Sequence, residues 1–171
     1  MAQSGTAPAL RAGSERFPSS NLGRGVMKYT GTIGIIFIRK NGPKYLLVLN
    51  RSSKNVSFTG GMRKSIDRSL IANVRREIYE ESGLRPDQYI IHKTDLVHEF
   101  IYGAHKKAYT GSLAKNKVYI IETSATKFKT IDTSMKTLGY HKKKDVLKMI
   151  TFIDLKKIFL KADEYIRKEL M

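Results

Sequence analysis

The sequence predicts a mixed α/β domain, because strand-like and helix-like apolar patterns alternate along it. Apolar runs of strand length lie on both sides of a segment whose apolar residues recur every three or four positions. Turn-forming residues such as those at 41–43 separate these segments. With 171 residues, 41% of them hydrophobic, the chain can bury one ordinary core.

The first elements are expected to be strands. Residues 32–38 are almost wholly apolar, which is typical of a buried strand. Residues 45–49 follow a turn and predict the second strand of a hairpin. Residues 56–58 are expected to form a short third strand that Gly60 and Gly61 stop.

A helix is predicted over residues 67–82. Four apolar residues recur there at helical spacing: Leu70, Ile71, Val74 and Ile78. Asp67 and Ser69 are the two candidates for the N-terminal cap, and Gly83 is placed to end the helix.

The C-terminal half is expected to contain further strands and to end in helices. Residues 89–101 and 116–123 are extended in pattern and predict strands. Residues 124–146 are polar and rich in lysine, and are expected to form a long loop with little regular structure. The apolar residues of 149–153 predict another strand. Two helices are expected to close the domain, over residues 155–160 and 163–170.

Composition sets the domain limits and excludes several classes of site. Residues 1–25 are rich in Ala, Gly, Ser and Pro, which predicts a flexible leader before a domain over residues 26–171. A tag and an organelle-targeting extension are the alternatives for this leader. No apolar run approaches the ~18 residues of a membrane span, so we expect no membrane partner. The lack of cysteine excludes a disulfide scaffold and a thiol nucleophile, and fits a reducing intracellular compartment such as the cytoplasm or nucleus.

The net charge predicts a polyanionic partner. Lys and Arg number 32 against 15 Asp and Glu, which leaves +17. The excess is distributed over the whole chain and is not confined to a tail. Such a field attracts nucleic acid, nucleotides or other polyanions. The alternative is a lysine-rich proteome, in which the charge serves solubility alone.

Three glutamates indicate a site for a divalent cation. Glu77, Glu80 and Glu81 are spaced i, i+3 and i+4, so they share one face of the predicted helix. They repel one another, and near the C-terminal end of the helix they also oppose its dipole. Mg²⁺ or Mn²⁺ would offset this repulsion, since both prefer oxygen ligands. Gly61 would let the backbone approach the metal, so its carbonyl is a further candidate ligand.

The segment 60–84 resembles the Nudix box, G-x5-E-x7-R-E-U-x-E-E-x-G-U with U aliphatic. Every fixed position of its second half matches: Arg76, Glu77, Ile78, Glu80, Glu81, Gly83 and Leu84. The first half departs from the pattern, because counting from Gly61 puts Asp67 at the first Glu and leaves one extra residue before Arg76. This longer spacing resembles the branch of the family that decaps U8 snoRNA and hydrolyses inosine diphosphate.

The resemblance implies an α/β/α sandwich with a mixed central sheet and a metal-dependent pyrophosphohydrolase. It implies that Glu77, Glu80 and Glu81 hold Mg²⁺ or Mn²⁺, with Gly61 as an added ligand. Arg76 would orient the carboxylates by ion pairing. The general base would be Glu77 or a later glutamate. Of the two later options, we favour Glu99 over Glu122 because it ends an extended segment, beside His98 as a further metal or phosphate contact.

Substrate contacts are expected from aromatic and basic residues. A nucleobase or cap needs an aromatic face, and the chain has no Trp, so Phe58, Phe100, Tyr102 and Tyr109 are the candidates. A lysine cluster is expected to follow an RNA phosphate backbone: Lys142, Lys143 and Lys144. A core position for the aromatic residues and a solvated loop for the lysines are the alternatives.

The sequence is compatible with three functions. The first is cleavage of a nucleoside diphosphate linkage at a capped or 5′-modified RNA end, which the charge favours. The second is the same chemistry on free nucleotides such as inosine diphosphate, dinucleoside polyphosphates or nucleotide sugars. The third is an RNA-binding or ribonucleoprotein component of the same fold without essential catalysis. Members of the family are often homodimers, but no sequence feature identifies an interface.

Overall fold

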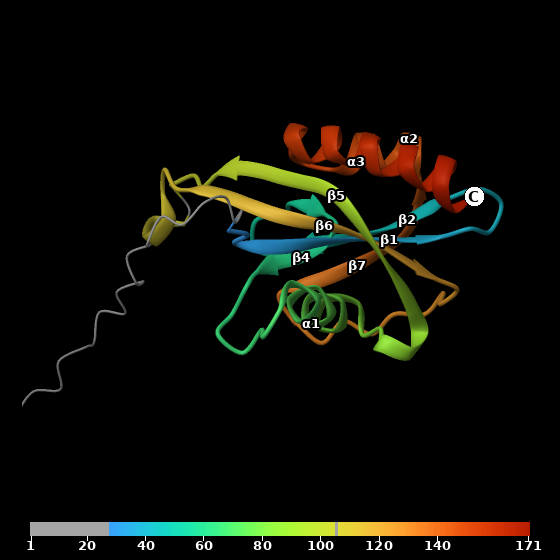
Figure 1. The fold of residues 1–171 in the computed structure, drawn as a ribbon, viewed down its shortest axis with the longest axis horizontal. Coiled ribbons are helices and arrows are strands. Elements are labelled where there is room, and N and C mark those ends of the chain that lie inside the picture. The colour runs from blue at the N-terminus through green and yellow to red at the C-terminus, as the bar shows by residue number, and fades with distance from the viewer. Residues whose placement is uncertain (1–27, 105) are drawn as a thin grey trace, which may run out of the picture.

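The computed structural model describes residues 28–104 and 106–171, which form a mixed sheet with helices on both faces (Figure 1). The predicted α/β/α sandwich is confirmed. The expected leader, residues 1–25, lies outside the described residues. The strands are β1 (Gly31–Ile38), β2 (Lys44–Asn50), β3 (Val56–Ser57), β4 (Thr59–Met62), β5 (Tyr89–Ile101), β6 (Leu113–Thr123) and β7 (Met135–Lys142). The helices are α1 (Leu70–Ser82), α2 (Lys143–Met149) and α3 (Ile153–Tyr165), with short turns η1 (Pro86–Gln88), η2 (Lys107–Tyr109) and η3 (Ile166–Leu170).

Strand β1 lies at the centre of the sheet and organises it. The main order is β3-β2-β1-β6-β5, with β1 parallel to β6 and the other neighbouring pairs antiparallel. β1 pairs with β2 at its C-terminal end, and with β4 over residues 31–34 at its N-terminal end. β7 pairs with the far edge of β2. This fork brings the glycines of β4 to the start of β1, where the candidate site lies.

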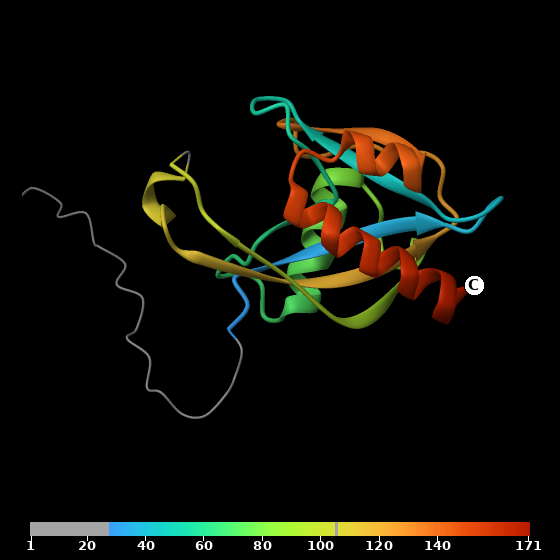
Figure 2. The same cartoon turned by 90° about the horizontal axis from the view of Figure 1, so that it is seen from above.

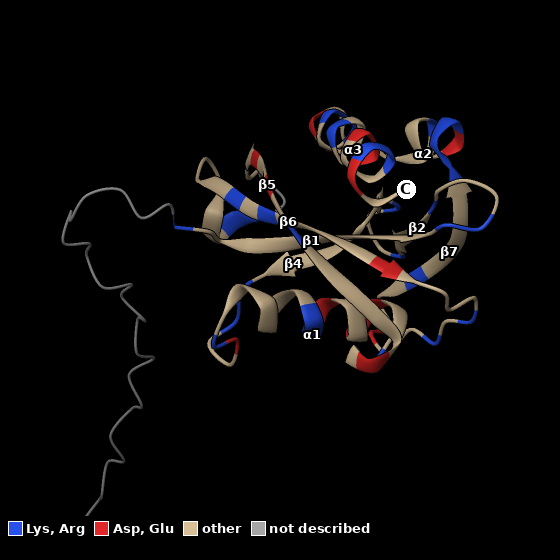
Figure 3. Ribbon diagram, turned by 45° about the vertical axis from the view of Figure 1, so that its right-hand side comes forward, with Lys and Arg blue, Asp and Glu red and all other residues tan. Residues whose placement is uncertain are grey.

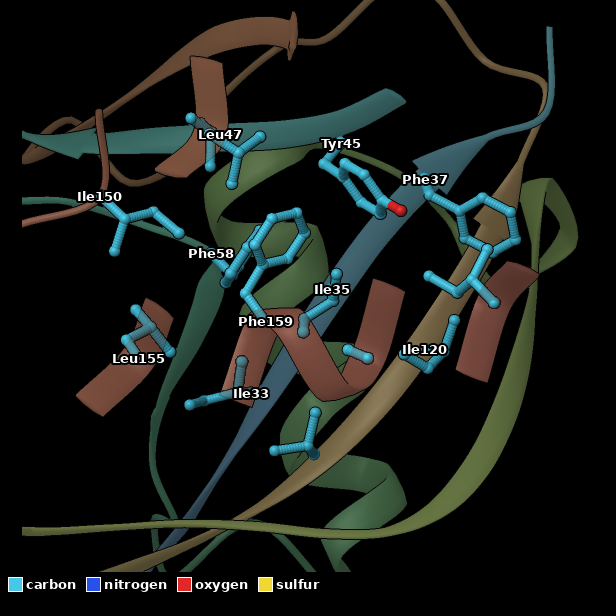
Figure 4. Packing of buried hydrophobic residues seen from close by; sticks show 14 residues of the cluster. Ile33, Ile35, Phe37, Tyr45, Leu47, Phe58, Ile120, Ile150, Leu155 and Phe159 are labelled. Carbon is cyan, nitrogen blue, oxygen red and sulfur yellow. The ribbon is translucent and has the colours of Figure 1, made fainter. Parts of the chain in front are cut away.

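The larger core lies between the sheet and the C-terminal helices α2 and α3 (Figures 1 and 4). Alternate residues of β1 face it, among them Ile35 and Phe37, which are fully buried. Phe159 of α3 packs on the ring of Tyr45 with centroids 4.7 Å apart and on that of Phe58 at 5.4 Å. This packing, edge-on against Tyr45 and tilted against Phe58, fixes α3 across the sheet.

The second core lies under α1, on the opposite face. Val74 and Ile78 of α1 are fully buried against Ile36 and Ile121, which point to this face from β1 and β6. Figure 2 shows α1 and α3 on opposite sides of the sheet, crossing it in different directions. Each helix therefore buries one apolar stripe, as the helical spacing of the sequence requires.

Residues 124–146, expected to form a loop, contain β7 and the start of α2, so this prediction was wrong. The reason is a bulge. The β2–β7 register shifts between Leu47 and Val48, and Gly139 has a φ of +80°. The extra residue sends Leu138 to the α3 core and Tyr140 to the α1 core, so the apolar residues of β7 do not show a simple period of two.

The predicted strand over residues 149–153 was also wrong, and so was the break between two C-terminal helices. α2 ends at Met149 and α3 begins at Ile153. Between them, Ile150 is buried and Thr151 exchanges two hydrogen bonds with Val56. α3 then continues directly into η3, because the apolar residues of both segments belong to one buried stripe.

Two further details differ from the expectation. Gly60 and Gly61 do not stop a strand but lie within β4. Helix α1 starts at Leu70 rather than at residue 67. Of the two candidate caps, Ser69 is confirmed, because its side chain accepts a hydrogen bond from the Ala72 N–H. Gly83 ends the helix in the left-handed conformation, as predicted. None of the helices in the described part of the chain is long and apolar enough to cross a membrane.

A buried carboxylate fastens the C-terminal helices to the sheet. Asp163 is fully buried and accepts hydrogen bonds from the Tyr45 hydroxyl, from Lys143 Nζ at 2.7 Å and from Arg167 Nε at 3.0 Å. Burial acts to raise the pKa of Asp163, but these three donors outweigh it and hold the pKa below its usual value.

Replacing Asp163 with Asn is expected to lower the free energy of unfolding by about 1.5–3 kcal/mol at pH 7, since charged hydrogen bonds are lost. Because the folded pKa is depressed, this contribution is present above the pKa of the unfolded chain. The difference between the two proteins should therefore shrink as the pH falls below about 4. Urea denaturation at several pH values measures it. The neighbouring Glu164→Gln, an exposed position paired with Lys168, is the control and should change stability little.

Candidate active site

Helix α1 directs two of its carboxylates at the glycines of β4. Glu77 and Glu81 are only 7% and 6% exposed. A Cβ added to Gly61 would lie 2.5–2.9 Å from the carboxylate atoms of Glu77, so only glycine leaves room for this side chain. Glu81 Oε2 accepts a hydrogen bond of 3.1 Å from the Gly60 N–H. The glycine pair thus forms the surface on which the two buried carboxylates rest.

Arg76 connects the acidic residues of the site. Its Nη1 lies 2.7 Å from Glu77 Oε1 and 3.0 Å from Glu80 Oε2. Its Nη2 donates to the Met62 carbonyl at 3.0 Å, which ties α1 to the end of β4. The side chain is 12% exposed, and its ion pairs with the surrounding acids outweigh burial and raise the pKa of Arg76 above its usual value.

Asp67 completes this network. The sequence pattern placed Asp67 at the first Glu of the box but did not predict its pairing with Arg76. Arg76 Nε and Nη2 reach its two oxygens at 3.0 and 2.9 Å, a bidentate pair. The Lys64 N–H donates to it at 2.7 Å. The hydrogen bonds from Arg76 hold the pKa of Asp67 below its usual range. The extra residue of the segment is accommodated in the loop before α1, and counting six residues from Gly61 was the signal for Asp67.

Burial disfavours the charged forms of two of the glutamates, Glu77 and Glu81. Burial raises the pKa of Glu77 above its usual value despite the pairing with Arg76. Burial, with the nearby Glu77 charge, raises the pKa of Glu81 to about 9. In the described residues no three acidic or histidine side chains converge closely enough to form a ready-made metal site. The donor set itself, three carboxylates of which two are buried beside backbone glycines, fits a hard divalent cation.

A cleft of about 710 Å³ opens beside the glycine pair. It brings together residues of β4, β5 and the start of α3. Six residues singled out from the sequence line it: Phe58, Gly61, His98, Glu99, Phe100 and Tyr102. Phe58 is also part of the core, because its ring is 3% exposed and packs on Phe159 (Figure 4). Tyr102 is similarly buried, while Phe100 is partly exposed.

The two alternatives for a later glutamate lie in different places. Glu99 lines the cleft, and its carboxylate pairs with Lys115 Nζ at 2.9 Å while the side chain stays 49% exposed. Glu122 lies opposite Phe37, at the other end of β1, which is about 20 Å away along the strand. There it pairs with Arg39 and with His92 at 2.9 Å. Glu122 is therefore remote from the cleft.

The lysines at 142–144 also lie away from the cleft. Lys142 pairs with Lys44 at the end of β2 that is remote from the glycines of β4. Lys143 is engaged by Asp163. Figure 3 shows basic segments on α2, α3 and β6, and acidic segments on α1, α2 and α3. Among the cleft-lining residues of the described chain, Lys106 is the one lysine or arginine.

The sequence did not single out Asp154 as a cleft residue. Its Oδ2 lies 2.8 Å from His98 Nε2, so it links the first turn of α3 to β5. Phe152, the residue before α3, and Asn116 of β6 line the cleft as well. The signal for Asp154 was available as an acid in a helical first turn, but the strand predicted over 149–153 obscured the start of that helix.

Solved structures with a similar fold are Nudix proteins. The Ap4A hydrolase of C. elegans gives a TM-score of 0.63 at 15% identity, covering 82% of this chain and 99% of that one. The NUDIX domain of Shewanella oneidensis NrtR, solved with ADP ribose, gives 0.62 at 18%, covering 85% and 90%. The E. coli dihydroneopterin triphosphate pyrophosphohydrolase gives 0.62 at 11%, covering 78% and 95%.

No protein-family model matches the sequence, and a search of curated proteins gave no match. Identities of 11–18% are too low to transfer a substrate, but the shared architecture extends over most of each chain. Together with the mixed sheet and the placement of α1 against β4, this likeness shows that the chain has the fold of the Nudix hydrolases.

Proposed function

We propose that the protein is a metal-dependent pyrophosphohydrolase of nucleotide derivatives. The observation that carries this proposal is the position of two buried carboxyl groups of α1 next to a glycine pair that also lines a large cleft. A structural role explains the cluster poorly, because two acidic side chains buried four residues apart are costly to ionise, as the raised pKa of each shows. The neighbours of this fold include an Ap4A hydrolase and a domain solved with ADP ribose, which supports a nucleotide substrate.

In this proposal Glu77, Glu80 and Glu81 hold Mg²⁺ or Mn²⁺, with the Gly61 carbonyl as a further ligand. The cation would supply charge neutralisation for the pyrophosphate and acidify the attacking water. Arg76 is a positioning residue, since it bonds Glu77 and Glu80 and anchors α1 to the Met62 carbonyl. Asp67 in turn holds Arg76 by two hydrogen bonds.

The proton of the attacking water needs an acceptor. Glu77 is one candidate, as a carboxylate beside the glycine pair. Glu99 is the other, because it lines the cleft and is half exposed, with only Lys115 as its ion-pair partner in the described part of the chain. Glu122 is a weaker candidate, because it lies at the far end of β1, away from the cleft.

For the substrate we propose a capped or 5′-modified RNA end, with free nucleotides as the second candidate. The net charge of +17 favours RNA, since a free nucleotide needs no extended basic surface. Lys142, Lys143 and Lys144 would then contact the RNA body at a distance from the reacting end. The cleft, with Lys106 as its lysine, would take the terminal nucleotide.

The first prediction concerns turnover. With Mg²⁺ or Mn²⁺, the protein should hydrolyse at least one of capped RNA, cap analogue, inosine diphosphate, dinucleoside polyphosphates and nucleotide sugars. Glu80→Gln should lower kcat at least about 100-fold, because a ligand of the cation is weakened. Product masses from the full panel measure this. Glu164→Gln, which removes an exposed glutamate of α3, should retain full activity.

If no substrate is cleaved while RNA still binds, the enzyme proposal fails and the RNA-binding alternative takes its place. If free nucleotides are cleaved and capped RNA is not, the pyrophosphohydrolase proposal stands and the decapping proposal fails.

A second prediction concerns the close fit of Gly61. Gly61→Ala should lower the free energy of unfolding by about 1–3 kcal/mol, because the new methyl group displaces the Glu77 carboxylate. In a Glu77→Ala background the same change should cost much less, since the displaced atoms are gone. Denaturant titration of the four proteins measures the coupling. Equal costs in both backgrounds would contradict the packing described here.

A third prediction concerns RNA. Replacing Lys142 and Lys144 with Gln, which leaves the Lys143–Asp163 pair intact, should weaken binding of uncapped RNA and reduce the salt dependence of binding by up to about two phosphate contacts. Filter binding over a range of about 50 to 200 mM salt gives the slope. Replacing Lys156 and Lys157 of α3 with Gln is the control with an equal change of charge. An equal effect of both double variants would contradict a specific role for the lysines at 142–144.

A further inference from the structure

We propose that the cleft binds a guanine base and that Asp154 recognises the base by its edge. This inference rests on the proposed function and names the nucleotide that would be cleaved. It follows from the combination of an aromatic surface with a carboxylate in one cleft.

The aromatic surface is a row of rings on one face of β5. His98, Phe100 and Tyr102 alternate along the strand and line the cleft. The rings of His98 and Phe100 are stacked, with centroids 5.2 Å apart and planes at 28°. Phe100 and Tyr102 follow at 5.0 Å. Phe152, 44% exposed, adds an aromatic ring at the start of α3. Phe100 and Phe152 are the rings with exposed surface, and such faces stack with any nucleobase, so they provide affinity without choosing among bases.

In this proposal, Asp154 discriminates among the bases. Its side chain is 44% exposed in the cleft, so the carboxylate can still accept hydrogen bonds from a ligand. His98 Nε2, 2.8 Å from Oδ2, fixes its orientation and connects it to the aromatic row. An ionised carboxylate offers acceptors only. Guanine presents two adjacent donors, the N1–H and the 2-amino group, whereas hypoxanthine presents the N1–H alone and adenine an amino group beside an acceptor nitrogen.

His98 is held between the carboxylate and the aromatic row. It is 7% exposed, so its ring belongs largely to the protein interior. Asp154 fixes the ring through Nε2, and Phe100 stacks on it. The exposed part of the Asp154 carboxylate is therefore the polar group of this pair that remains open to a ligand in the cleft.

The test is binding of nucleoside monophosphates to the metal-free protein, measured by calorimetry. Wild type should bind GMP about tenfold or more tightly than AMP, with IMP between them, since each edge hydrogen bond adds discrimination. Asp154→Asn should weaken GMP binding about tenfold and leave AMP binding unchanged. The asparagine oxygen retains the bond to His98, so the helix stays attached. Asp145→Asn, which removes an acid from the first turn of α2, is the matched control and should behave as wild type.

Equal binding of GMP and AMP by wild type, or unchanged GMP binding by Asp154→Asn, would overturn the inference. The assay needs neither metal nor hydrolysis, so it tests the base site separately from the proposed enzyme activity. Guanine binding without turnover would support the base site and contradict the enzyme activity. The source of the guanine is distinguished by 7-methyl-GMP and by RNA with a 5′ guanosine. Tighter binding of 7-methyl-GMP supports a cap, because its cationic ring gains from the aromatic row, and tighter binding of unmodified GMP supports an ordinary guanine nucleotide.

Discussion

The candidate site depends on a single guanidinium that neutralises charges which would otherwise repel. Arg76 reaches Asp67, Glu77 and Glu80 at once and also holds the Met62 carbonyl. A lysine could not replace it, because the geometry requires several donors fixed in one plane. This one residue joins the loop before α1, the helix itself and the end of β4. The position of the glycine pair beside the carboxylates follows from that connection.

The local pattern of the sequence was sufficient to predict the helix that carries the candidate site's acidic face. The spacing of Glu77, Glu80 and Glu81 and the position of Gly83 follow from helix geometry, so α1 and its acidic face were predictable. β7 was missed because a bulge at Gly139 disrupts its alternation. Contacts between segments distant in the chain could not be predicted from the local pattern. The partnership of Asp154 with His98 depends on where α3 starts and on how it crosses β5.

The cleft and the lysines at 142–144 lie in different parts of the structure. The cleft is largely aromatic and apolar and has acidic groups near it, whereas the lysines and arginines are spread over many elements, among them α2, α3 and β6 (Figure 3). A small ligand can occupy the cleft without touching the lysines at 142–144, which lie at the other end of β2. A polymer can contact both regions. In the proposed function, the cleft and the lysines at 142–144 would therefore contact different parts of the substrate.

The parallel pairing of β1 with β6 determines when the cleft can form. Thr30 and Lys115 are 85 positions apart and are joined at the start of this pairing. Contacts of such long range require closure of a large loop, which slows folding. During synthesis α1 and the β4 glycines emerge early, but the opposite wall of the cleft, on β5 and α3, is completed only near the C-terminus. A nascent chain thus carries its acidic helix for about half of translation before the cleft beside the β4 glycines is complete.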